Sequence, residues 1–320
     1  MTVRKDPQTQ FDFFVPLMRD LALKDQRETM ERPFFSLQKR KRLKPIEYVN
    51  GDGDSAVRVK VEAVQAYGIA TIWDADILIW AASALNRLKA EGRNDLPREL
   101  RTTAYDLLRS ISRDTGGKGY QELRAALDRL STTTIFTSIR AKRGRDTRFN
   151  WLDSWEVEVD PKTEKPIALK ITLSNWVYEG FVNERSILTL HPDYFLITGG
   201  LERQVYRIAR KHAGDQEAGW TCRVTVLHEK TGSDSAPKEF NRMLRKIVEA
   251  NDLPEYEVAF TRTVDGSPAV HFVRRAAAER AQIRADLERE LAAEKRREAE
   301  DRRRVEVDDR MGRLAHRQSA

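Results

Sequence analysis

The sequence has one cysteine, few histidines and no apolar run long enough to cross a membrane. Of its 320 residues, only Cys222 is a cysteine and five are histidines. One thiol cannot form an intramolecular disulfide, and scattered imidazoles do not predict a zinc site. The longest predominantly apolar run, residues 77–85, falls short of the roughly 18 to 20 residues that span a bilayer. We therefore expect a chain stabilised by packing, without metal, cofactor or membrane span.

The N-terminal residues also lack the continuous apolar stretch of a secretory signal, so we expect a cytoplasmic protein. Catalytic motifs are equally scarce. The run Gly116–Gly119 resembles a phosphate-binding loop, but that motif needs glycine in place of Ser112 and serine or threonine in place of Gly119. The histidines are too far apart in sequence to form the paired histidines of a nickase. The sequence therefore predicts no enzyme activity.

Positive charge is in excess, with a formal net charge of +7, and it is concentrated in two places. One cluster runs from Lys39 to Arg42 and includes Lys44. The other, opposed only by Asp146, contains Arg140, Lys142, Arg143, Arg145 and Arg148. Like charges on one loop repel one another unless an anion lies nearby, so the second cluster predicts contact with phosphate or a minor groove.

Between these clusters, the hydrophobic periodicity predicts a helix-turn-helix. A helix over 74–90 precedes a short helix over 102–111 and a glycine-rich turn over 114–119. A second helix follows, whose apolar residues recur at i, i+3, i+7 and i+10 from Tyr120. A β-branched strand, the basic loop 140–148 and a return strand come next. A recognition helix followed by a basic hairpin is typical of a winged-helix domain.

A polar stretch with two prolines, 160–166, predicts a domain boundary, after which the second half repeats the plan. It has a helix over 201–213, a brief helix near His228, a helix from Pro237 to about Asn251, and a hairpin with Asp265 and Gly266 at its tip. The predicted fold class is α+β, with two tandem winged-helix domains. We expect a flexible segment over 1–32, the domains over 33–160 and 167–275, and a charged helical tail over 276–320 that is either solvated or a dimer contact.

In a winged helix, the second helix enters the major groove, and the hairpin reaches the backbone or the minor groove. Arginine suits guanine and asparagine suits adenine, whereas lysine suits phosphate. The candidate DNA-binding residues on these helices are Lys118, Gln121 and Arg124 in the first half and Lys238, Asn241, Arg242 and Arg245 in the second. Each could be part of an ordinary solvated helix face, but the repetition of the layout favours DNA binding.

The segments 31–37 (ERPFFSL), 68–79 (GIATIWDADILI) and 103–108 (TAYDLL), with Tyr194-Phe195 and Leu201-Glu202-Arg203, occur in this order along the chain. In sequence and spacing they resemble the plasmid replication initiator protein A family, from about residue 31 to residue 275. The resemblance implies an iteron-binding initiator whose two winged helices grip successive major grooves of repeated origin sequences and help to melt an adjacent AT-rich region. It also implies monomers at the origin and dimers that repress the initiator's own gene.

An N-terminal motif points to a further partner. Gln10, Phe11, Asp12, Phe13 and Phe14 resemble the short peptide by which bacterial proteins dock into the groove of the replicative sliding clamp. Phe11 and Phe13 stand where leucine is usual. The alternative is that these aromatic residues fold back onto the first domain.

The sequence favours an initiator that recruits the host helicase and clamp, and three alternatives remain. A winged-helix repressor, including one that represses its own gene, would bind one inverted pair of sites instead of many direct repeats. A relaxase or nickase is disfavoured by the missing histidine pair. A partition adaptor would bind DNA without supporting replication.

Overall fold

Most of the elements that the periodicity predicts are present in the computed structural model, which describes residue 15 and residues 22–141, 145–164, 166–183, 186–276, 279 and 289. The first half contains β1 (Lys24–Gln26), α1 (Arg27–Met30), β2 (Ile46–Asn50), η1 (Gly53–Ser55), β3 (Val57–Glu62), α2 (Ala75–Ala90), β4 (Glu99–Thr102), α3 (Ala104–Ser110), α4 (Gly117–Thr132), β5 (Thr134–Thr137), β6 (Thr147–Asn150), β7 (Leu152–Val159) and β8 (Pro166–Leu173). The second half contains α5 (Asn175–Val182), β9 (Ile187–Thr189), η3 (Pro192–Leu196), α6 (Gly200–His212), β10 (Trp220–Arg223), α7 (Val224–Thr231), α8 (Pro237–Ala250), β11 (Tyr256–Arg262) and β12 (Pro268–Arg274). In the described part of the chain, no helix is long and apolar enough to cross a membrane.

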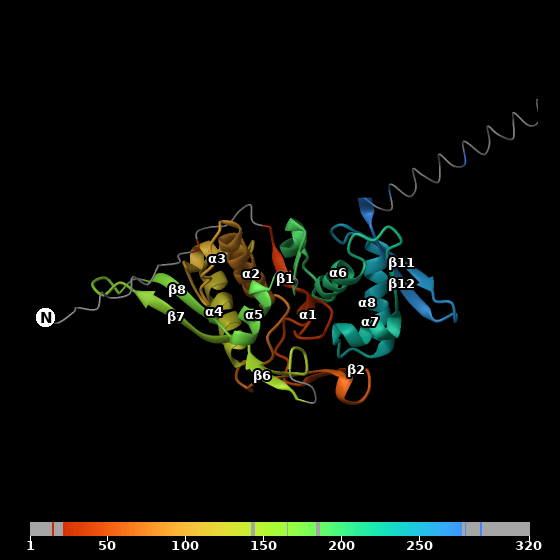
Figure 1. The fold of residues 1–320 in the computed structure, drawn as a ribbon, viewed down its shortest axis with the longest axis horizontal. Coiled ribbons are helices and arrows are strands. Elements are labelled where there is room, and N and C mark those ends of the chain that lie inside the picture. Colours follow the sequence, from red (N-terminus) through yellow and green to blue (C-terminus); the bar gives the residue numbers. More distant parts are fainter. Residues whose placement is uncertain are drawn as a thin grey trace, which may run out of the picture.

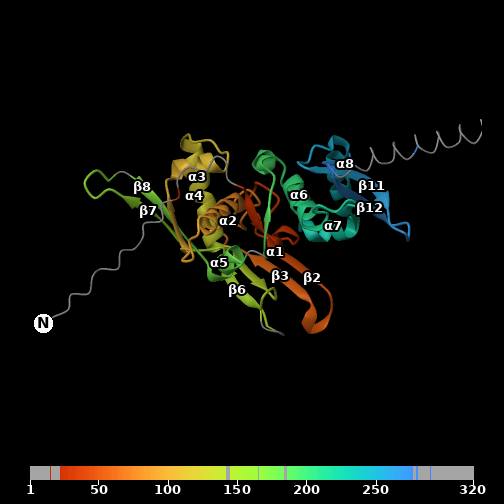
Figure 2. The ribbon, with the colours of Figure 1, turned by 45° about the horizontal axis from the view of Figure 1, so that its top comes forward.

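One order of elements occurs twice. The first unit consists of α2, β4, α3, α4, β7 and β8, and the second unit consists of α6, β10, α7, α8, β11 and β12. In each unit the strands form an antiparallel sheet with the last strand in the middle, in the orders β4-β8-β7 and β10-β12-β11. The hairpins β7–β8 and β11–β12 lie toward opposite ends of the molecule (Figures 1 and 2).

Apolar residues at helical spacing determine which face of each helix is buried. In α8, Phe240, Leu244 and Ile247 are at most 2% exposed, and the predicted polar residues lie on the opposite face. By contrast, α2 is buried all round from Ala75 to Leu85. The buried apolar residues of both units belong to one continuous cluster.

The strands after α4 correct the predicted topology. β5 and β6 belong to a separate four-stranded sheet of order β2-β3-β5-β6. The basic loop 140–148 follows β5 and leads into β6, so it is part of a different hairpin from that of the first unit. That hairpin is β7–β8, and β8 pairs with both β7 and β4. The stretch 160–166, where the sequence predicts a domain boundary, joins β7 to β8 as the turn of that hairpin. Periodicity along a strand cannot identify the sheet, since pairing partners are distant in sequence.

Residues 22–32, part of the segment 1–32 that was predicted to be flexible, contain the strand β1 and the helix α1. β1 pairs with β9, and α1 packs against α6. Asp25 is 4% exposed and accepts a hydrogen bond of 2.8 Å from Nε of the buried Arg207 in α6. These charges are buried because they are paired. Of the predicted tail over 276–320, only residues 276, 279 and 289 are among the described residues.

A second ionic cluster joins this segment to the second unit. The carboxylate of Glu31, which is 7% exposed, lies 2.9 Å from Nζ of Lys211 and 3.1 Å from Nε2 of His212. Burial raises the pKa of Glu31, but the hydrogen bonds from His212 and Lys211 outweigh it and lower that pKa well below its usual value. Burial lowers the pKa of His212. Residues 22–32 therefore fasten α6 to the rest of the chain.

Candidate nucleic-acid interface

The exposed face of α4 carries three of the side chains predicted to contact DNA. The side chain of Lys118 is 84% exposed, and its ammonium lies 3.8 Å from the carboxylate of Glu122, one turn away. Gln121 and Arg124 are exposed on the same helix. The turn before α4 is tight, since a Cβ at Gly119 would collide with the carbonyl oxygen of Asp114. The glycine lets the turn close against the start of α4.

The exposed face of α8 carries the corresponding set. Lys238, Asn241, Arg242 and Arg245 are all exposed. Arg242 donates two hydrogen bonds, of 2.8 and 2.6 Å, to the carboxylate of Glu239. An anionic ligand would have to compete with Glu239 for Arg242, whereas Arg245 makes no ion pair within the described residues.

In each unit, one arginine of the last helix lies over an aromatic ring of the strand that follows this helix in the unit. The guanidinium carbon of Arg124 is 5.8 Å from the ring centroid of Trp155 in β7, and that of Arg245 is 5.7 Å from the ring of Phe260 in β11. Such contacts restrict the rotamers of the arginine while leaving its donors free. Trp155 and Phe260 were not among the predicted site residues, because periodicity along a strand does not show which side chain faces a neighbouring helix.

The basic loop contributes fewer free charges than its sequence suggests. Arg140 lies with its guanidinium 3.7 Å from the ring centroid of Trp176, and it donates a 2.8 Å hydrogen bond to the Trp176 carbonyl. Burial lowers the pKa of Arg140, which is thus a packing residue. Arg145 and Arg148 are exposed. Lys142 and Arg143 lie outside the described residues, as do Gln10, Phe11, Asp12, Phe13 and Phe14.

The hairpin of the first unit is acidic. β7 carries Asp153, Glu156 and Glu158. The basic residue on the described part of β8 is Lys170, whose ammonium lies 3.1 Å from the carboxylate of Glu156. Carboxylates repel phosphate, so this hairpin is less suited to the DNA backbone than the basic hairpin that the sequence predicted. In the second unit, Arg223 of β10 lies 2.7 Å from Asp265 in the hairpin turn.

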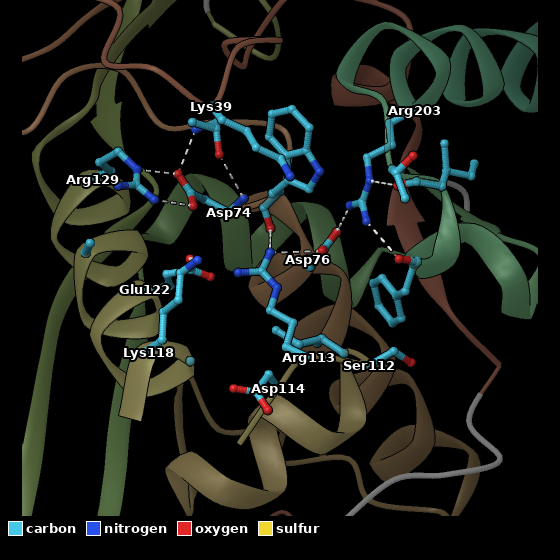
Figure 3. Close-up of a pocket in the computed structure, with 18 residues that line it drawn as sticks. Lys39, Asp74, Asp76, Ser112, Arg113, Asp114, Lys118, Glu122, Arg129 and Arg203 are labelled. Carbon is cyan, nitrogen blue, oxygen red and sulfur yellow. Dashed lines mark hydrogen bonds and ion pairs between the residues drawn. The ribbon is translucent and has the colours of Figure 1, made fainter. Parts of the chain in front are cut away.

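Buried ion pairs position α4 (Figure 3). Asp74, which is 1% exposed, precedes α2 and accepts two hydrogen bonds of 2.7 Å from the guanidinium of Arg129 in α4. Burial acts to lower the pKa of Arg129, but the hydrogen bond and charge of Asp74 raise it overall. Asp74 also accepts from the backbone N–H of Thr71. The carboxylate therefore fixes α4 against α2 and makes no capping hydrogen bond to α2.

A second buried carboxylate connects the two units. Asp76, also 1% exposed, lies 3.0 Å from Arg113 in the turn between α3 and α4, and 2.7 Å from Arg203 in α6 (Figure 3). Burial raises the pKa of Asp76, and the two guanidinium groups oppose that rise. The turn between α3 and α4 is thus linked to α6, the first helix of the second unit.

These pairs border a cleft of about 510 Å³ that was not predicted. A charge at position 76, directly before the apolar run 77–85 of α2, is a sequence signal for a buried partner. The sequence does not identify Arg113 and Arg203 as those partners, since they lie 37 and 127 residues away. Within the described ranges, no group of three or more histidine, cysteine or acidic side chains could hold a metal ion.

Comparisons with known proteins agree with this architecture. The family model described as Replication initiator protein A matches residues 24–258. A relative from Wigglesworthia glossinidia brevipalpis, described as "Putative replication protein", is 32% identical over 262 residues, which cover 81% of this chain and 92% of the relative. Two crystal structures of domains 2 and 3 of RctB superpose with TM-scores of 0.54 and 0.50, each at 13% identity and over 75% of this chain, and over 94% and 95% of the solved chains. At that identity the likeness concerns the fold alone.

Proposed function

The chain belongs to the replication initiator protein A family, and we propose that it initiates replication of a plasmid by binding repeated double-stranded DNA sequences at the origin. The observation that carries the proposal is the repetition of one unit, each time with an exposed polar and basic helix face. We infer that both units are winged helices, because each follows the order helix, strand, helix, helix, strand, strand. The domains then correspond to the first unit with its added four-stranded sheet, and to the second unit.

The side chains on α4 and α8 divide by chemistry. Gln121, Arg124, Asn241 and Arg245 are suited to hydrogen bonding with base edges in a major groove, and Arg242 joins them when base contacts replace its bonds to Glu239. The phosphate contacts are assigned to Lys118 and Lys238 near the starts of the helices, and to Arg145 and Arg148 in the basic loop. Arg140 leaves this set because it packs on Trp176.

The initiator acts without intrinsic catalysis in this proposal. Binding of two units to successive major grooves strains the duplex between them, and this strain assists opening of an adjacent AT-rich region. The host helicase is then recruited. Residues 10–14 would dock into the sliding clamp. The clamp should retain a peptide of residues 6–18 more strongly than its Phe13→Ala, Phe14→Ala version, and equal retention of the two peptides would rule this docking out.

Footprinting of the purified protein on the DNA that flanks its own gene tests the proposed function. Two salt concentrations separate specific from nonspecific binding. We expect regular protection over several direct repeats beside an AT-rich tract. A single protected inverted repeat at the promoter would identify a repressor instead, and the absence of any sequence preference at either salt would overturn specific recognition.

A further inference from the structure

A basic segment between the two units, residues 38–44, has no role in the function proposed above. Lys39, Arg40, Lys41 and Lys44 are exposed, whereas Arg42 is 8% exposed. Within the described part of the chain, none of the four exposed residues forms an ion pair with a carboxylate. Neighbouring like charges without counterions are a feature of surfaces that bind polyanions.

Hydrogen bonds hold the segment on the loop between β3 and α2. The backbone N–H of Ile69 donates a 2.9 Å hydrogen bond to the carbonyl of Arg42. The ammonium of Lys41 donates hydrogen bonds of 3.1 and 2.9 Å to the carbonyls of Gln65 and Ala66. Gly68, with φ of +81°, allows this approach, because a Cβ there would collide with the Lys41 side chain. Lys41 is therefore a structural residue, and Lys39 and Arg40 are displayed from a fixed backbone.

The same segment contacts the turn between α7 and α8. Nη1 of Arg42 donates a 2.8 Å hydrogen bond to the carbonyl of Gly232. The side-chain amide of Gln38 donates a hydrogen bond to Asp234. Lys39 and Arg40 lie between Gln38 and Arg42 in the sequence, so they stand next to the turn between α7 and α8.

Toward the first unit, the segment opens onto α4. A groove of about 490 Å³ is lined by Lys39, Arg40 and Lys41 on one side and by residues of α4 that include Gln121, Arg124 and Asp128 on the other. Arg129, which also lines it, is paired with Asp74. The wall of the groove is therefore positive overall, and it continues the exposed face of α4.

We propose that Lys39 and Arg40 bind the phosphate backbone of the duplex that α4 and α8 occupy, at the stretch between the two units. The inference rests on the proposed DNA binding and adds a contact that belongs to neither recognition helix. Two units in successive major grooves leave one stretch of backbone between them. The segment, which is anchored to the turn between α7 and α8 and lines a groove with α4, lies beside that stretch. Because its anchors lie in the loop before α2 and in the turn between α7 and α8, the contact also fixes the spacing of the two units on DNA.

The test compares the intact protein with a Lys39→Ala, Arg40→Ala double variant and with a control, Lys60→Ala, Arg87→Ala. The control removes the same charge from exposed residues that pair with Glu62 and Glu91. Binding to origin DNA and to unrelated DNA is titrated across a salt series. In the double variant we expect the slope of log K against log[salt] to flatten by about 1.8 and the affinity to fall roughly 30-fold at ~0.15 M salt, since each lost phosphate contact removes about 0.9 from the slope. The ratio of specific to nonspecific affinity should change little.

The outcomes separate this inference from the proposed function. Phosphate-ethylation interference should disappear in the double variant only at the backbone between the two protected tracts. If the intact protein prefers origin DNA but the slopes of both variants match its own, the segment does not bind phosphate. The inference is then overturned, and the proposed function stands. If the control flattens the slope as much as the double variant does, net charge is responsible and the inference is again overturned. A wild-type protein that does not prefer origin DNA would overturn the proposed function as well.

Discussion

The last helices of the two units, α4 and α8, are held in place by different kinds of interaction. α4 is anchored by Arg129, which is paired with the buried Asp74, and the turn before it is anchored by Arg113, which is paired with the buried Asp76. Buried ion pairs depend on both partners, since removing one leaves the other charged and desolvated. The position of α4 is therefore vulnerable to single substitutions.

α8 relies on apolar and close backbone contacts instead. The ring of Phe240 stacks on His228 of α7 with centroids 4.3 Å apart. Gly232, with φ of +64°, ends α7 where a Cβ would collide with Pro33. Such contacts add up from many small terms. The comparison shows that one order of elements can be stabilised in two ways, and that the first unit depends on particular charges for the placement of α4.

Asp76→Asn provides the strongest test of this difference. The change leaves Arg203 buried without its counterion and weakens the hold on Arg113. We expect the free energy of unfolding to fall by about 3 to 5 kcal/mol, measured by urea denaturation. The matched control is Glu91→Gln on the same stretch of chain, where an exposed pair with Arg87 should cost less than about 0.5 kcal/mol. Equal effects of the two variants would contradict the structural role of Asp76.

Glu31→Gln tests the ionic cluster that fastens the second unit, and we expect a loss of about 2 to 3 kcal/mol at pH 7. Glu31 and His212 both have a pKa below the usual value in the folded protein, so the unfolded chain binds their protons more readily. Stability of the intact protein should fall as pH decreases below about 6.5 through His212 and below about 4.5 through Glu31.

The same pH series distinguishes the two groups. Glu31→Gln should abolish the component below about pH 4.5, so the difference in unfolding free energy between intact protein and variant should shrink on acidification. Urea denaturation at several pH values measures both curves. A difference that is constant between pH 7 and pH 3 would exclude Glu31 as the source of the acid sensitivity.

Arg124→Ala and Arg245→Ala compare the proposed roles of α4 and α8 directly. If both arginines contact base edges, each substitution should cost about 1 to 2 kcal/mol of specific binding and relax specificity at one position of the repeat, without a matching loss on unrelated DNA. Competition binding with single-base variants of the repeat measures this. An effect of only one variant would assign base recognition to one unit and make the other a backbone-binding unit.

Arg145→Ala should have the smallest effect. We expect the salt slope to flatten by about 0.9 and the affinity for all sequences to fall by about 5-fold at ~0.15 M salt. Arg140→Ala, in the same loop, should leave the slope unchanged and lower thermal stability instead, because Arg140 packs on Trp176. Salt titrations and melting curves of the two variants give opposite patterns if this division is right.

The extents of the main helices could be predicted from the sequence, because they depend on interactions between residues three or four positions apart. The spacing of Leu123, Leu127 and Leu130 was enough to orient α4, and the pattern around Phe240 was enough to orient α8. The same helical spacing places Arg124, Asn241 and Arg245 on the exposed faces of these helices. Local periodicity alone therefore predicts that the helix-turn-helix occurs twice along the chain.

Features that depend on contacts between residues distant in the sequence were decided by the tertiary structure. Sequence could not show that the strand after α4 joins β3, that the 160–166 stretch turns a hairpin back toward β4, or that Arg140 packs inward. Nor could it show that the charged residues Asp25 and Glu31 are buried, because a charge enters the interior only when a counterion from elsewhere in the chain meets it. Such pairings join residues more than a hundred positions apart, so they exist only once the chain has folded.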